Sequence, residues 1–183
     1  MSVSTEATGV GGPSSRMLDG DAIMFNEANN IEDMHLTFGV AREEYGVGIS
    51  FVTEIVGMQR IMPVPDVPHY IKGVINLRGK VIPIMDLRAR FGMPEAEYTE
   101  RTVIIVLDVD AIPIGLVVDE VRDVLEILPA SIDPPPHFGS VRDNRSLIRG
   151  LGKSGDLVAV ILDIRRLVSE EAAQDHAVGA PVQ

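Results

Sequence analysis

Cysteine is absent from this 183-residue chain, and no apolar run approaches the length needed to cross a membrane. Without cysteine the chain has no disulfides, thiolate metal ligands or cysteine nucleophile, which is compatible with a reducing compartment. A spanning helix needs about 20 apolar residues, and the N-terminus lacks a charged start followed by an apolar core. We therefore expect a cytoplasmic protein with no direct membrane insertion.

Positive charge is also scarce. Lys and Arg number 16 against 27 Asp and Glu, which gives a formal net charge of -11. This charge opposes the counterion release on which nucleic-acid binding depends, and it disfavours anionic membrane surfaces. The expected partners are proteins and not nucleic acids.

Arrangements of catalytic residues are missing as well. The histidines show no H-x-x-x-H or H-E-x-x-H spacing, and the chain has no Gly-x-Ser-x-Gly elbow. Asp108, Asp110 and Asp119 leave open an acidic metal-dependent hydrolase, although no EF-hand-like loop is present. A solvated acidic face explains the same residues. We expect a protein that is not an enzyme and that needs no metal and no cofactor.

The clearest positive pattern runs from Ile71 to Phe91 and reads IKGVINLRGKVIPIMDLRARF. Two apolar runs flank Arg78-Gly79-Lys80, which predicts a β-hairpin with two cations at its tip. Asp86 is expected to be the N-cap of a short helix and Gly92 its C′ stop.

A fainter copy of this pattern lies at residues 148–165, where Gly150 matches Gly73 and Asp163 matches Asp86. The preceding segments, residues 45–55 and 112–121, also match each other. Such a repeat predicts two copies of a small domain. Short strands between Gly and Pro turns predict an all-β barrel or sandwich of about ten strands. Copies of about 60 residues are marginal alone, so we expect them to share an interface, and an exchange of terminal strands is one way to do so.

The predicted organisation has five parts. A flexible N-terminal tail covers residues 1–33, and a flexible C-terminal tail covers 174–183, because both segments are polar and lack periodicity. The folded domain spans 34–173. It divides into a first copy at about 34–98, a second at about 99–162 and a C-terminal helix at about 163–173.

The string GVINLRGKVIPIMDLRARF, together with VTEI at residues 52–55 and GLVVD at 115–119, closely resembles the CheW family of bacterial chemotaxis coupling proteins. The resemblance covers about residues 36–168, and NLRG followed by a P-I-x-D-L strand end is a specific signal. It implies a fold of two five-stranded SH3-like barrels related by a pseudo-twofold axis. It also implies a non-enzymatic adaptor that couples chemoreceptor cytoplasmic tips to the regulatory domain of the histidine kinase CheA and helps to assemble the signalling array.

The resemblance further implies two sets of contact residues. The receptor-binding positions are Val52, Glu54, Arg78, Gly79 and Val103. The kinase-binding positions are Phe138 and the region containing Gly57, Met58 and Ile61.

The residues themselves also permit plainer readings. Arg78 is an ordinary choice for an exposed turn, and Phe138, which follows three prolines, is explained equally by a place in the core. Strand alternation places Glu54 on the same face as Val52, where it is explained as an outward polar residue. A homo-oligomeric structural protein with self-pairing strand edges is a further alternative. Which receptors and which output pathway the adaptor would serve stays open.

Overall fold

A computed structural model describes residues 30–136 and 144–169. The chain divides into two compact units, Met1–Asn30 and Ile31–Gln183, and the fold below is that of the second unit. Most of the predicted N-terminal tail, Phe138, the end of the predicted C-terminal helix and the C-terminal tail lie outside the described residues.

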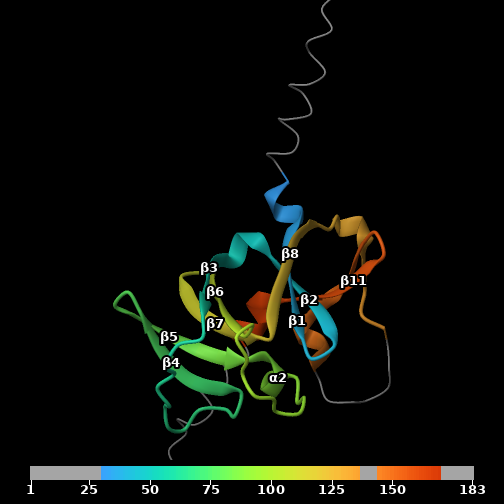
Figure 1. The fold of residues 1–183 in the computed structure, drawn as a ribbon. Coiled ribbons are helices and arrows are strands. Elements are labelled where there is room, and N and C mark those ends of the chain that lie inside the picture. Colours follow the sequence, from blue (N-terminus) through green and yellow to red (C-terminus); the bar gives the residue numbers. More distant parts are fainter. Residues whose placement is uncertain (1–29, 137–143, 170–183) are drawn as a thin grey trace, which may run out of the picture. The chain divides into compact units, whose positions relative to one another are not determined.

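Eleven strands of the described chain form two sheets (Figure 1). The six-stranded sheet has the order β8-β1-β2-β11-β10-β9 and consists of β1 (Met34–Val40), β2 (Glu43–Gly48), β8 (Glu120–Glu126), β9 (Ile132–Asp133), β10 (Ile148–Ser154) and β11 (Leu157–Leu162). The five-stranded sheet has the order β3-β6-β7-β5-β4 and consists of β3 (Val52–Gly57), β4 (Ile71–Leu77), β5 (Lys80–Asp86), β6 (Val103–Val109) and β7 (Ile112–Val118).

The helices are short. They are α2 (Leu87–Arg90), the 3₁₀ turns η1 (Ile31–Asp33), η2 (Ile49–Phe51), η3 (Pro129–Ser131) and η4 (Asn144–Leu147), and a helical segment at residues 164–169. Among the described residues, none is long and apolar enough to span a bilayer. The predicted all-β class with a short helix near the C-terminus is confirmed. Neither sheet closes on itself in the described chain, so the SH3-like barrels stay a prediction.

The two sheets exchange strands between the two sequence copies. Strands β1 and β2 of the first copy lie between β8 and β11 of the second, and β6 and β7 of the second lie between β3 and β5 of the first. Each sheet joins the copies by one antiparallel pairing, β1 with β8 or β3 with β6. Each also has one parallel pairing, with Tyr45 opposite Val160 in one sheet and Gly115 opposite Ile84 in the other. The predicted boundary near residue 98 therefore divides the sequence repeat but not the sheets.

The matched glycines occupy equivalent places in the two sheets. Strand β4 bulges against β5 just before Gly73, and β10 bulges against β11 just before Gly150. A Cβ atom added at Gly73 would overlap the Met62 carbonyl oxygen, and one at Gly150 would overlap that of Asp133. The repeat therefore contains a glycine at each of two positions where another backbone segment passes too closely for a side chain.

The predicted caps of the short helix are confirmed. The Asp86 side chain accepts hydrogen bonds from the backbone N–H groups of Arg88 and Ala89, and Gly92 has a φ of +69° just beyond the helix. Asp163 repeats the device, because its Oδ1 accepts from the Arg166 backbone N–H at 3.1 Å. These caps satisfy orphan donors at the helix starts.

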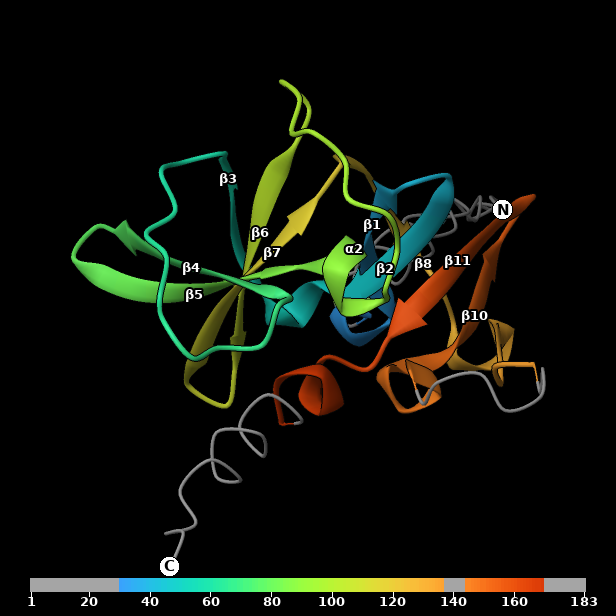
Figure 2. The ribbon, with the colours of Figure 1, turned by 90° about the horizontal axis from the view of Figure 1, so that it is seen from below.

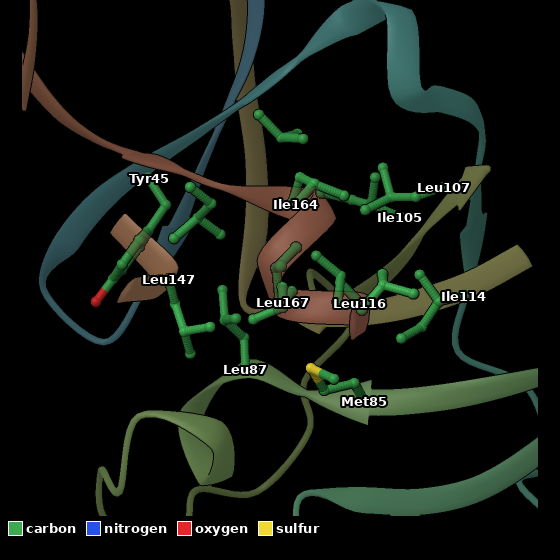
Figure 3. Packing of buried hydrophobic residues seen from close by; sticks show 14 of the residues in the cluster. Tyr45, Met85, Leu87, Ile105, Leu107, Ile114, Leu116, Leu147, Ile164 and Leu167 are labelled. Atoms are coloured by element: carbon green, nitrogen blue, oxygen red, sulfur yellow. The ribbon is translucent and has the colours of Figure 1, made fainter. Parts of the chain in front are cut away.

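A central cluster of buried apolar residues joins the two sheets (Figure 3). Tyr45 comes from the six-stranded sheet, Leu107 and Leu116 come from the five-stranded one, and Ile164 and Leu167 project from the segment at residues 164–169. A smaller cluster, called the hairpin cluster here, lies on the other face of the five-stranded sheet and contains Ile75, Ile82, Ile84, Ile104, Val106 and Val117. Ile105 and Leu107 of β6 belong to the central cluster, and Ile104 and Val106 belong to the hairpin cluster, so these residues mark the two faces of the sheet.

His35 on β1 gives the fold a pH dependence. Its side chain is 2% exposed, and its Nδ1 donates to the Asp33 carbonyl oxygen at 2.9 Å. Burial lowers the pKa of His35 below its usual 6.5, and the charge of Arg149 acts in the same direction, while Asp33 opposes the shift. The unfolded chain therefore binds more protons as the pH falls through 6.5, so protonation favours unfolding.

We expect the free energy of unfolding to fall when the pH is lowered from about 7.5 to about 5.5, with a steeper slope than in a His35→Gln variant. Urea unfolding curves at a series of pH values measure both slopes. The comparison of slopes separates this effect from the general loss of stability that a buried substitution causes. Equal slopes would show that His35 protonates as easily in the folded chain as in the unfolded one.

Candidate functional site

The tip of the β4–β5 hairpin is a two-residue turn. Leu77 pairs with Lys80, and the intervening Arg78 and Gly79 have φ values of +52° and +84°. Positive φ at both positions defines a type I′ turn, whose twist matches that of the strands. The Asn76 Oδ1 accepts from the Gly79 backbone N–H at 2.9 Å and fastens the turn. The predicted hairpin is confirmed, and Arg78 stands at its apex.

Arg78 is held by Glu54 on β3. Its Nη1 donates to Oε1 at 3.2 Å and its Nη2 to Oε2 at 2.9 Å, which is a two-pronged contact between guanidinium and carboxylate. The Arg78 side chain is 77% exposed and that of Glu54 is 26% exposed. An ion pair this open contributes at most about 1 kcal/mol to stability. Its main effect is to fix the orientation of a cation that faces solvent.

A β-bulge at Thr53 corrects the expected orientation of Glu54. Val52 pairs with Leu107, but after the bulge Glu54 pairs with the adjacent Val106. Neighbouring strand residues face opposite sides, and Leu107 belongs to the central cluster whereas Val106 belongs to the hairpin cluster. Glu54 therefore lies on the face opposite to Val52, and the prediction of a shared face is wrong because simple alternation ignores the inserted residue.

A pocket of about 200 Å³ opens beside the Glu54–Arg78 pair. Its apolar lining includes Leu77, Ile82 and Val106, all from the hairpin cluster or packed against it, together with Pro113 near the start of β7. The sequence could not have located this pocket, because its walls come from β3, from the β4–β5 hairpin and from the β6–β7 hairpin.

The five predicted receptor positions fall into two groups. Glu54, Arg78 and Gly79 lie together at the hairpin tip. Val52 and Val103 both pack against the central cluster, on the other face of the sheet. Val103 pairs with Gly57, at the end of the β3–β6 ladder opposite to Val52 and Leu107. Within this unit the structure therefore brings Glu54, Arg78 and Gly79 together. Val52 and Val103 lie on the other face of the sheet, at opposite ends of the β3–β6 ladder.

The predicted kinase region lies at the end of β3 and in the loop that follows. Gly57 ends the strand with open space around it, and Met58 and Ile61 are half-buried against the hairpin cluster. Sequence reasoning did not single out Met62 or Val64, whose side chains are 45% and 38% exposed just beyond. The alternating prolines at 63 and 65 could have indicated these exposed residues, because prolines keep a segment extended.

The three aspartates of the hydrolase alternative do not converge. Asp108 and Asp110 lie at the β6–β7 turn, where Asp108 accepts from the Ala111 backbone N–H and Asp110 pairs with Arg165 at 2.6 Å. Asp119 lies at the other end of β7. It pairs with Arg88, whose pKa it raises by hydrogen bonding, and accepts from the Ala41 backbone N–H at 2.7 Å. Over residues 30–136 and 144–169, no three His, Asp or Glu side chains are grouped as a metal site requires.

Comparison with known proteins gives a consistent result. Residues 34–172 match the CheW-like domain. The chain is 40% identical over 136 residues to the chemotaxis protein CheW of Klebsiella aerogenes, covering 74% of this chain and 81% of that protein. It is 35% identical over 139 residues to the chemotaxis protein CheW of Bacillus subtilis, covering 76% of this chain and 88% of that one. The crystal structure of the scaffolding protein TtCheW from Thermoanaerobacter tengcongensis matches with a TM-score of 0.66 at 34% identity, covering 72% of this chain and 89% of that chain.

Proposed function

The chain belongs to the CheW family of chemotaxis proteins, and on that premise we propose that it is a non-enzymatic adaptor between chemoreceptors and the histidine kinase CheA. It would bind the cytoplasmic tips of the receptors and the regulatory domain of the kinase, and so be recruited to the signalling array in the cytoplasm. The observation that carries the proposal is the exposed Arg78, which an I′ turn and Glu54 present to solvent in one orientation.

The proposed receptor contact is a helix laid against the sheet around the hairpin tip. A receptor helix offers an apolar stripe and acidic groups, and Arg78 can pair with a carboxylate while Glu54 takes a basic or amide group. Gly79 lets the helix backbone approach the turn closely, because it carries no side chain. Val52 and Val103 complete the set carried over from the family, and they lie on the opposite face of the same sheet.

The proposed kinase contact uses the end of β3 and the loop after it, namely Gly57, Met58 and Ile61, with Phe138 as a second contact. Phe138 lies outside the described residues, so its role rests on the family resemblance alone. Separate receptor and kinase surfaces would let one chain bind both partners at once. Contacts that are weak singly become strong in an array through multivalency.

The Arg78→Ala variant tests the receptor contact. We expect its affinity for a recombinant receptor-tip fragment to fall at least about tenfold, as for an arginine anchor of an interface. Binding of the CheA regulatory domain should not change, and stability should change by less than about 1 kcal/mol. Titration calorimetry with each partner measures both affinities.

Arg165→Ala is the matched control, because Arg165 is also an exposed arginine paired with a carboxylate, Asp110, but belongs to another element. The Phe138→Ala variant should show the reverse pattern, with weaker kinase binding and intact receptor binding. If the Arg78 and Arg165 variants lose the same receptor affinity, the effect is due to net charge and not to a contact at the hairpin tip. If the wild-type chain binds neither partner, the adaptor function is wrong although the family assignment stands.

A further inference from the structure

The pocket beside Arg78 has the size of a single side chain. Its volume of about 200 Å³ is below the roughly 300–1,000 Å³ typical of small-molecule sites. Ile82 and Val106 at its floor are each 3% exposed, and Leu77 and Pro113 form partly exposed walls. Such a lining favours an aliphatic group over a polar ligand.

Four charged side chains line the pocket, and Arg78 and Glu54 among them neutralise each other. The Asp108 Oδ1 accepts from the Ala111 backbone N–H at 3.0 Å within its own turn. Lys80 also lines the pocket, and within the described part of the chain its side chain forms no ion pair or hydrogen bond. Its ammonium group therefore lacks any polar partner among the described residues, unlike the Asp108 carboxylate, and is the group that a bound protein would pair with.

We propose that this pocket receives one large aliphatic side chain of the receptor helix, and that Lys80 pairs with an acidic residue about one helical turn away from it. Residues three or four apart lie on the same helix face, so one helix can present both groups. The inference rests on the proposed receptor contact and specifies its chemistry. The apolar anchor is then on the hairpin-cluster face of the sheet, beside Arg78, and not at Val52 or Val103.

The first test blocks the pocket with a matched pair of variants. Pro113 lines the pocket, whereas its neighbour Ile112 does not and is 48% exposed. We expect Pro113→Trp to weaken binding of a recombinant receptor-tip fragment about tenfold or more, the factor supplied by burying one leucine-sized side chain. Ile112→Trp should bind within about twofold of wild type, because adjacent strand residues face opposite sides.

The second test reverses the charge of Lys80. We expect Lys80→Glu to weaken receptor binding about tenfold at low salt and less at high salt. Arg42→Glu makes the same change of charge at the exposed β1–β2 turn and should leave the affinity within about twofold of wild type. Thermal unfolding of all four variants checks that each is folded.

The receptor side identifies the occupant. Truncating each exposed Leu, Ile, Val or Met of the fragment to Ala should reveal one position whose loss weakens wild-type binding but hardly affects the Pro113→Trp variant. The inference is overturned if Arg78→Ala weakens binding while folded Pro113→Trp and Lys80→Glu bind normally, and the adaptor function then survives. It is also overturned if Pro113→Trp weakens kinase binding or self-association instead of receptor binding. Absence of wild-type binding to the fragment would reject the proposed function itself.

Discussion

Gly73→Ala should destabilise the folded chain by about 4 kcal/mol or more, at the upper end of what single substitutions do. Gly73 has a φ of +136°, which side chains rarely adopt, and an added Cβ would overlap the Met62 carbonyl oxygen. That carbonyl cannot move away freely, because it accepts from the Val74 backbone N–H at 2.9 Å, and Met62 donates back to Val74 at 2.8 Å. Urea unfolding of the purified variant measures the loss.

Gly57→Ala is the control for this experiment. Gly57 is also a strand glycine, but it has no positive φ, and a Cβ atom there meets nothing within 4 Å. Its replacement should change stability by less than about 1 kcal/mol. Gly150→Ala should also be strongly destabilising, because a Cβ atom there would overlap the Asp133 carbonyl oxygen, although Gly150 lacks the positive φ of Gly73. Similar small losses for all three would show that the bulged strands relax around a methyl group.

The Leu167→Ala variant should lose about 2–5 kcal/mol of stability, the usual range for a buried leucine. Leu167 is fully buried and projects from the segment at residues 164–169 into the central cluster, beside Leu87 and Leu116 (Figure 3). The central cluster around Leu167 contains residues of both sheets, so the site cannot collapse easily around the cavity. Thermal and urea unfolding both report the loss.

The neighbouring Arg166→Ala is the matched control for Leu167→Ala. Both changes place alanine on the same short helix, but the Arg166 side chain is 62% exposed. Its loss should cost less than about 1 kcal/mol. If both variants lose the same amount, the helix contributes through its backbone and not by covering the core.

Local features of this fold were predictable from the sequence. The Arg78-Gly79 turn, the Asp86 cap and the Gly92 stop each depend on a few adjacent residues whose backbone preferences agree. The repeat was also readable, because backbone crossings at Gly73 and Gly150 leave only one residue type possible. For the turn and the two caps, a short stretch of chain contains the whole physical cause, whereas at the two glycines the sequence shows only the residue type that the crossing requires.

Features that depend on distant partners were not predictable. The Thr53 bulge becomes visible only when β3 is aligned with β6, and it moves Glu54 to the face opposite the expected one. The ion pair between Glu54 and Arg78 and the pocket beside it join three hairpins or strands. The pattern of one segment cannot reveal a pocket whose lining residues come from other segments.

The exchange of strands also has a consequence for synthesis on the ribosome. Figure 2 shows the β1–β2 hairpin beside β11, and Tyr45 pairs with Val160 there. At about 5–20 residues per second, the ribosome needs on the order of 10 s to make the intervening chain. A nascent chain that ends in the connector before β6 already contains Glu54 and Arg78, yet both of its hairpins still lack the strands beside which they lie. The speed of translation therefore sets how long the apolar edges of β2 and β5 stay open to chaperones or to other nascent chains.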